Sequence, residues 1–331
     1  MVKILKKILL LLLALFILLA VYLFVGKSKP VEKVEWGVSF SKRYALELGL
    51  DWQKVFSDIL EDLKVKKIRL IAYWDEIEFE KGRYNFDDLD WQIDEIEKRK
   101  GEIIFAVGRR MPRWPECYEP NWIKGLKEEE KQKYILDFLA ETIDHFKDRK
   151  SIKIWQIENE PFLRTFGKCP WVDTKFLDKE IALVRHLDPS RPIMITESGE
   201  FSTWIGGARR ADIVGTSLYR KIHGRLGYVE YPIPPVFYQR KSNLIKLLFD
   251  LKEIIAIEVQ AEPWGDKPTR ELTVEEQDIT MSFERFNDVL EYTRSAGFNK
   301  AYLWGVEWWY WRKEKFDDDR FWNRVKELFE K

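Results

Sequence analysis

Short apolar runs alternate with longer amphipathic stretches from about Val34 to the end of the chain. The short runs have the length and residue types of buried strands, and the longer stretches repeat apolar residues at helical spacing. The runs predict eight strands, over 34–40, 67–72, 103–107, 152–157, 192–196, 212–217, 254–259 and 300–305. The stretches between them predict helices over 52–63, 89–99, 128–146, 175–187, 236–249, 273–295 and 316–331, and only 201–210 is too short for a full helix.

Eight strands that alternate with helices predict an α/β protein with a parallel sheet, and eight is the number that closes into a (β/α)8 TIM barrel. The competing fold, an open doubly wound sheet, usually has a Gly-rich first turn and fewer strands. Apart from the short stretch 26–33, the sequence has no repeat, low-complexity tract or linker to a second domain. We therefore assign residues 31–331 to one (β/α)8-barrel domain.

The first 30 residues have a different pattern, because 8–25 is an uncharged apolar run flanked by lysines. As a helix this run is about 27 Å long, enough to cross the hydrocarbon core of a bilayer. A cleaved signal peptide is the alternative, but its apolar core is usually shorter, and the best cleavage site, around Gly26, contains a lysine. We predict a single uncleaved transmembrane helix within residues 1–30. The lysine distribution favours a barrel outside the cytoplasm, which would be secreted if the helix were removed.

Composition excludes several classes of protein. Lys plus Arg and Asp plus Glu both number 56, so there is no basic excess of the kind that nucleic-acid binding requires. The three histidines form no zinc motif, and no Gly-rich phosphate loop is present, so we expect neither a metal nor a cofactor. The 15 Trp, 13 Tyr and 21 Phe exceed the needs of a core, and Trp stacks well on the apolar faces of sugars. A carbohydrate is therefore the expected partner, and we expect a monomer.

Glutamates follow the fourth and seventh predicted strands. Glu158 and Glu160 end the fourth, and Glu258 and Glu262 follow the seventh. Active sites of such barrels lie at the carboxyl ends of the strands, and glycoside hydrolysis requires two carboxyl groups on either side of the scissile bond. Periodicity alone does not choose within either pair.

Asn159-Glu160-Pro161 after strand four and Glu258 after strand seven resemble the large clan of retaining barrel glycosidases that includes cellulases, mannanases, xylanases and β-galactosidases. Further segments are similar to that clan and occur in the same order: Ile68-Arg69-Leu70 with the loop to Phe86, Asp212 to Tyr219, and Tyr302-Leu303-Trp304-Gly305. The resemblance covers residues 34–331. It implies that Glu160 is the acid/base, selected by the preceding Asn159, and that Glu258 is the nucleophile.

The resemblance also implies that Arg69 and Tyr219 support the nucleophile, that Asn159 binds the sugar 2-hydroxyl, and that Trp304 is a platform for the sugar. Glu262 remains a rival nucleophile or a ligand of substrate hydroxyls. Several further aromatic residues fall at or beyond predicted strand ends, where substrate would lie: Trp74, Trp114, Trp155, Trp171, Trp264 and the aromatics of 304–311.

The loop after strand three contains Arg109, Arg110 and Arg113, which would bind substrate hydroxyls or acidic sugars, or else form ion pairs with Glu116, Glu119 and their neighbours. Cys117 and Cys169 follow strands three and four, which are adjacent in a barrel, so a disulfide that fastens the rim is a hypothesis that the sequence leaves open.

The function predicted from these residues is hydrolysis of β-glycosidic bonds by double displacement. Two alternatives remain: a transglycosylase that remodels cell-envelope glycans, because the same covalent intermediate can pass to a sugar acceptor, and a non-catalytic carbohydrate-binding barrel. The sequence does not identify the sugar.

Overall fold

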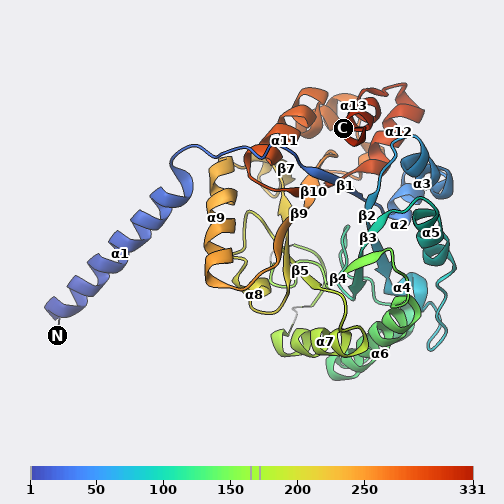
Figure 1. Ribbon diagram of the computed structural model, residues 1–331, viewed down its shortest axis with the longest axis horizontal. Coiled ribbons are helices and arrows are strands. Elements are labelled where there is room, and N and C mark those ends of the chain that lie inside the picture. Colours follow the sequence, from blue (N-terminus) through green and yellow to red (C-terminus); the bar gives the residue numbers. More distant parts are fainter. Residues whose placement is uncertain (1, 165, 171–172, 331) are drawn as a thin grey trace.

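All eight predicted strands form in the computed structural model, which describes residues 2–164, 166–170 and 173–330. They are parallel and close into a barrel in which β1 pairs with both β2 and β10 (Figure 1). The strands are β1 (Glu35–Ser39), β2 (Lys67–Tyr73), β3 (Glu102–Gly108), β4 (Ile152–Ile157), β5 (Ile193–Glu197), β6 (Ile213–Leu218), β9 (Glu253–Gln260) and β10 (Lys300–Trp304). The predicted TIM barrel is therefore confirmed.

Helices surround the barrel, and their amphipathic patterns place apolar residues against the strands. They are α3 (Trp52–Glu61), α5 (Asp87–Lys98), α6 (Glu128–Phe146), α7 (Thr174–Leu187), the short α8 (Ile205–Ala208), α9 (Pro235–Leu248), α10 (Val274–Met281), α11 (Phe283–Ser295) and α13 (Arg320–Phe329). Two short helices, α2 (Lys42–Glu47) and α4 (Trp74–Ile77), follow β1 and β2. The predicted helix 273–295 is two helices, because Ser282 has an extended backbone and caps α11 by accepting from the Arg285 backbone N–H.

Besides the short helices α2 and α4, a hairpin and a further helix were not predicted. The segment after β6 forms an antiparallel hairpin of β7 (Lys221–Gly224) and β8 (Gly227–Glu230). The aromatic run after β10 forms a helix, α12 (Val306–Phe316), whose Trp308, Trp309 and Trp311 are buried. Trp308 packs edge-on against Phe321 of α13 at 4.7 Å. The expectation that this run lines the rim is wrong beyond Trp304, because the run fills the space between the barrel and α13.

The barrel interior changes character along its axis. One layer is apolar and contains Ile104, Ile154, Met194, Ile213, Ile255, Ile257 and Tyr302. Side chains two residues further along a strand point to the same side, so Gln156 follows Ile154 and Thr196 follows Met194 toward the carboxyl end. An apolar plug therefore lies below a polar layer at the end where the candidate glutamates lie.

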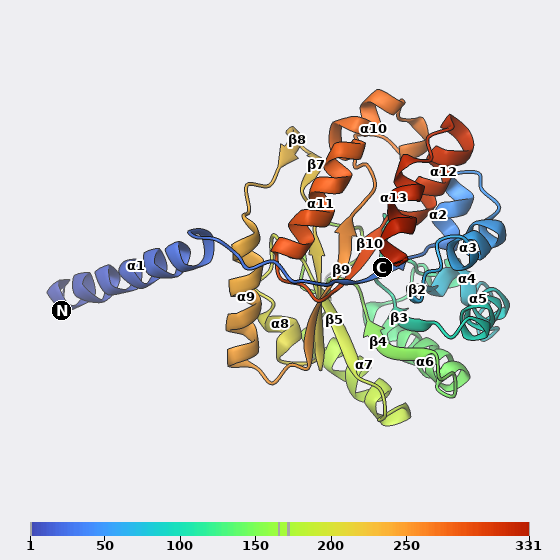
Figure 2. The ribbon, with the colours of Figure 1, turned by 45° about the horizontal axis from the view of Figure 1, so that its top comes forward.

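The apolar N-terminal segment forms helix α1 (Val2–Phe24), which extends away from the barrel (Figures 1 and 2). Its Lys3–Phe24 portion has a mean hydropathy of 2.9 and is long and apolar enough to cross a membrane. This agrees with a transmembrane helix by length and composition. The division at residue 30 stays a prediction.

Candidate active site

The turn after β4 sends Glu158 and Glu160 to different surroundings. Both residues have left-handed backbone, with φ of 55° and 42°, so the chain bends sharply around Asn159. The Glu158 carboxylate accepts from the backbone N–H groups of Arg109 at 2.8 Å and Arg110 at 2.6 Å, so it braces the loop after β3. The Glu160 Oε1 is buried and has no hydrogen-bond partner among the described residues. Of these two glutamates, Glu160 is therefore the one with a carboxyl oxygen that no described residue engages.

The environment of Glu160 favours its protonated form. Burial raises the pKa of this carboxyl well above its ordinary value, and the nearby charges of Glu258, Glu116 and Glu200 raise it further. The Glu160 backbone N–H donates to Thr196 Oγ1 at 2.8 Å, which fixes the turn against β5. A carboxyl held protonated near neutral pH is what a general acid requires.

A β-bulge aims Glu258 into the barrel. Ile255 and Ile257 both belong to the interior apolar layer, so simple alternation would point Glu258 outward. The β6 register passes from Thr216↔Ala256 to Ser217↔Glu258, which leaves Ile257 as the extra residue. Glu258 consequently lies on the interior side, in the polar layer.

Arg69 and Tyr219 both donate to the Glu258 carboxylate. Arg69 Nη1 lies 2.7 Å from Oε1, and the Tyr219 hydroxyl lies 3.3 Å from Oε2. The same fully buried guanidinium donates to Gln156 Oε1 at 2.8 Å and to Asn159 Oδ1 at 2.9 Å. One cation on β2 thus joins the ends of β4 and β9, and it is the charged partner of Glu258.

Glu262 belongs to a second charged cluster. It forms an ion pair with Arg113, which also reaches Glu307 Oε2 at 3.2 Å. The Arg113 guanidinium lies over the rings of Tyr44, at 3.6 Å, and Trp304, at 4.2 Å. Burial raises the pKa of Glu262, and Arg113 opposes that rise. The structure therefore separates the two rival glutamates: Glu258 lies with Arg69 and Tyr219, and Glu262 with Arg113.

One cavity of about 660 Å³ brings most of the predicted residues together. Its lining includes Trp114, Tyr219, Glu258, Glu262, Trp264 and Trp304. An unbroken series of ring contacts runs along it, from Tyr219 to Trp264 at 5.1 Å, to Phe166 at 5.3 Å and to Trp114 at 5.5 Å. Arg69, Asn159 and Glu160 are buried and do not themselves line this cavity; Arg69 meets the lining residue Glu258 at 2.7 Å. The cavity thus combines carboxylates with flat aromatic faces, as a carbohydrate site requires.

Trp74 lies elsewhere, so its assignment to the substrate rim is corrected. Its ring is fully buried, stacks on Phe138 of α6 at 5.6 Å, and donates to Glu78 Oε2 at 2.7 Å. Trp155 is also a core residue, because its indole N–H donates to the buried Asp188 at 2.8 Å. Both rings point outward between strands and helices. Trp171 lies outside the described residues.

Glu116 lines the cavity and was considered in the sequence only as an ion-pair partner. Its Oε2 accepts from Arg110 Nη2 at 2.6 Å, and its Oε1 accepts from Asn159 Nδ2 at 3.3 Å. Burial raises the pKa of Glu116 to about 7, although Arg110 opposes the shift. Arg109 forms ion pairs with Glu119 and Glu128. Of the two alternatives for this loop, substrate binding or ion pairs, Arg109 and Arg110 therefore form ion pairs. The contact with Asn159 joins distant segments, and no local pattern indicates it.

The hypothesised disulfide is present. Cys117 and Cys169 are bonded, with their Cα atoms 4.8 Å apart, and they join the loops after β3 and β4. These loops carry Arg113 and Glu116 on one side and Glu160 on the other. The bond therefore fastens the two segments that border the same side of the cavity.

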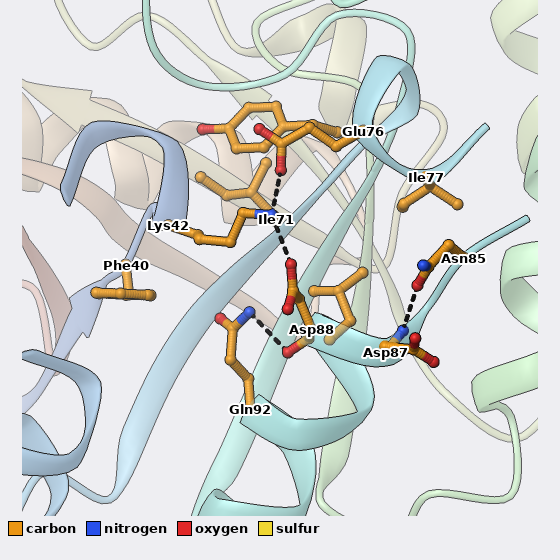
Figure 3. A pocket seen from close by; sticks show the side chains of 11 residues that line it. Phe40, Lys42, Ile71, Glu76, Ile77, Asn85, Asp87, Asp88 and Gln92 are labelled. Carbon is orange, nitrogen blue, oxygen red and sulfur yellow. Dashed lines mark hydrogen bonds and ion pairs between the residues drawn. The ribbon is translucent and has the colours of Figure 1, made fainter. Parts of the chain in front are cut away.

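A second, smaller hollow of about 180 Å³ is lined by residues of α2, β2, α4 and α5 (Figure 3). The Lys42 ammonium projects into it and contacts Glu76 at 3.0 Å and Asp88 at 2.7 Å. Asn85 accepts from the Asp87 backbone N–H, and Gln92 donates to the Asp88 carbonyl. Most polar groups of the hollow thus contact one another.

No family model matches the chain, and no curated protein matches it in sequence. Solved structures do match its fold. A GH5_18 protein from Streptomyces cattleya, determined with GlcNAc, superposes with a TM-score of 0.57 at 12% identity, over 82% of this chain and 70% of that one. Xylanase 10B from Thermotoga petrophila, determined with xylobiose, gives 0.54 at 15% identity, over 90% and 94%.

An exo-β-1,4-mannosidase from Opitutaceae bacterium strain TAV5 gives a TM-score of 0.55 at 13% identity, over 82% of this chain and 51% of that one. At such identities the likeness concerns the fold. The predicted resemblance to barrel glycosidases is confirmed at that level: the chain has the (β/α)8 architecture of these glycoside hydrolases.

Proposed function

We propose that the protein is a retaining glycoside hydrolase that acts on β-linked glycans, with Glu160 as acid/base and Glu258 as nucleophile. The observation that carries the proposal is the unequal environment of the two carboxyls. Burial and neighbouring carboxylates raise the pKa of Glu160, whereas Arg69 and Tyr219 donate to both oxygens of Glu258. A double displacement needs one protonated and one ionised carboxyl at its start.

In the first step Glu160 donates its proton to the glycosidic oxygen while Glu258 attacks the anomeric carbon, so the leaving group departs as an alcohol and a glycosyl ester forms. The ester removes the negative charge of Glu258, which is one cause of the raised pKa of Glu160. That pKa then falls, so the Glu160 carboxylate can take a proton from water. The water attacks the anomeric carbon, releases the sugar and restores both carboxyls.

The surrounding residues take supporting roles. Arg69 and Tyr219 hold Glu258 in place for attack, and the amide of Asn159 binds the sugar 2-hydroxyl. Trp304 is the platform for the sugar in the cleavage subsite, and Trp114 and Trp264 border the cavity for neighbouring sugars. The ion pair of Glu262 with Arg113 supports a role in binding substrate hydroxyls, with no part in the covalent step.

The substrate we propose is a β-linked oligo- or polysaccharide at or outside the cell surface. Proteins of the same fold were determined with GlcNAc, Manβ1-4GlcNAc and xylobiose, so hexoses and pentoses both fit this architecture. Helix α1 would anchor the barrel, as a monomer, to the outer side of a membrane, with its N-terminus inside. The mechanism uses no metal and no cofactor.

A trapping experiment tests the proposal. The full chain, in detergent micelles, is incubated with dinitrophenyl 2-deoxy-2-fluoro-β-glycosides of the gluco, manno, galacto and xylo series. We expect one of them to inactivate the enzyme and to leave one sugar on the peptide that contains Glu258. With the matching 2-hydroxy substrate, NMR should show that the β-anomer forms first. A label on Glu262, or an α-anomer formed first, would overturn the assignment.

A further inference from the structure

Helix α9 has an apolar stripe on its outer side. Val236, Tyr238, Lys241 and Ile245 are its buried residues and define the side that faces the barrel. Phe237, Arg240, Leu244, Leu247 and Leu248 follow one another at helical spacing along the flank beside that side; the first three are half-buried and the last two are exposed. Leu247 is 81% exposed and Leu248 is 66% exposed. Adjacent exposed leucines on one helix face are typical of a surface that meets another apolar phase.

The end of α1 covers only the first part of this stripe. The rings of Phe24 and Phe237 are 4.8 Å apart. Arg240 donates to the carbonyls of Tyr22 and Val25, and its guanidinium lies 4.9 Å from the centre of the Tyr22 ring. Leu247 and Leu248, in the last turn of α9, continue the same stripe and have no such cover from any residue that the structure describes.

The position of α1 determines how deep α9 would lie relative to a membrane. Tyr22 and Phe24 lie at the end of the apolar span, and Lys27 and Lys29 follow it. Aromatic residues prefer the boundary of a bilayer, and lysines remain on its polar side. If α1 spans a membrane, the segment around Tyr22 lies at this boundary, and Phe237 and Arg240, which contact it, lie there too.

We propose that the outer stripe of α9 rests in the interface of the bilayer that α1 spans, with Leu247 and Leu248 buried among lipid acyl chains. In both ribbon views α9 is the barrel helix beside α1, and it descends from the junction on the side toward which α1 extends (Figures 1 and 2). Helix α9 contains no acidic residue, and its exposed Lys246 suits anionic headgroups.

This placement has a consequence for the proposed glycosidase. Helix α9 runs along the barrel wall, so a barrel that rests on α9 has its axis inclined along the membrane (Figure 2). The cavity at the carboxyl ends of the strands then opens sideways over the lipid surface. A glycan held close to the membrane could therefore enter without rising above the barrel.

The test measures lipid contact at single positions in the full chain. Leu247→Cys is labelled with bimane and reconstituted into vesicles with or without brominated phosphatidylcholine, which quenches only fluorophores in contact with acyl chains. Phe79→Cys is the matched control, because Phe79 is a 71% exposed hydrophobic residue on the loop between α4 and α5. We expect at least a twofold loss of fluorescence at position 247 and none at position 79.

Equal fluorescence in both kinds of vesicle at position 247 would overturn the proposal. A blue-shifted but unquenched label there would also overturn it, and would indicate that a second copy of the chain covers the stripe. The inference rests on anchoring by α1, which vesicle flotation measures separately; a protein that does not float would refute both. Hydrolysis of a soluble aryl glycoside reports on the proposed active site independently, and neither substitution touches that site.

Discussion

The ends of β4 and β9 present the same side chain in two different ways. At the end of β4, a left-handed turn brings Glu160 to a buried position where its Oε1 has no partner among the described residues and other carboxylates lie close. At the end of β9, a bulge brings Glu258 to Arg69 and Tyr219. The difference teaches that backbone irregularities decide what surrounds each glutamate, although the residue type is the same.

The largest expected effect comes from removing the paired carboxylate. Glu258→Gln keeps the shape but cannot form the ester, so kcat/KM on an activated aryl glycoside should fall by about 10⁴-fold or more. Glu262→Gln is the matched control and should reduce kcat/KM far less, because it removes a substrate contact. Steady-state kinetics of both variants measure this. Equal losses would remove the distinction between the two glutamates.

Glu160→Gln should have a smaller effect that depends on the leaving group. General acid catalysis contributes about 10²–10⁴-fold, and a dinitrophenolate leaves without a proton. In this variant the rate of the first step, formation of the glycosyl ester, should therefore fall strongly for an alkyl glycoside and slightly for a dinitrophenyl glycoside. In the wild type, the raised pKa of Glu160 should keep kcat/KM high at pH values well above those at which carboxyl groups ordinarily titrate. The value of kcat/KM should then fall as the pH rises through the pKa of Glu160. A variant that retains this basic limb would assign it to another group.

Stability should respond in opposite directions to the same two substitutions. Glu258→Gln leaves the buried Arg69 without its carboxylate and should cost about 3–5 kcal/mol. Glu160 has a folded-state pKa above its unfolded value, so its stabilising contribution is present at low pH and is lost as pH rises through the folded pKa. Glu160→Gln should therefore raise the free energy of unfolding at neutral pH and change it little at pH 4. Urea denaturation at both pH values checks this, and destabilisation by Glu160→Gln at neutral pH would contradict it.

The smallest effect should come from the outer aromatic series. Trp114 is 56% exposed at the rim, whereas Trp264 contacts Tyr219. Steady-state kinetics on a disaccharide should show that Trp114→Ala raises KM by a few fold and leaves kcat unchanged, since stacking of this kind contributes about 0.5–1.5 kcal/mol. Trp264→Ala should have the larger effect. A fall in kcat for Trp114→Ala would place that ring closer to the reacting bond than we propose.

The strands could be predicted because each is a short apolar run bounded by polar residues, and the strand ends indicated where the glutamates would lie. The aromatic run 304–311 led to a wrong prediction, because aromatic residues occur both in a substrate cleft and in a helix that packs against the core. Only the packing against α13 shows which of the two applies. Trp74 misled for a related reason: a position at a strand end does not say whether the ring points into the barrel or toward α6.

Contacts between segments that are distant in the sequence could not be predicted from local patterns. The bulge at Ile257 depends on the register with β6, and the contact of Glu116 with Asn159 depends on how two loops fold over one another. Arg69 and Tyr219 were nevertheless expected beside Glu258, because the segments that contain them resemble those of barrel glycosidases, and both side chains donate to its carboxylate.

Arg69 also links the assembly of the barrel to its chemistry. Its guanidinium is fully buried and donates to Gln156, Asn159 and Glu258. These residues come from the ends of two strands, and Asn159 and Glu258 are 99 residues apart in the sequence (258 − 159). A barrel that closed with β9 out of register would leave this cation unpaired in the interior, which is strongly unfavourable. The register that places Glu258 in the polar layer is therefore also the register that leaves the Arg69 charge paired in the barrel interior.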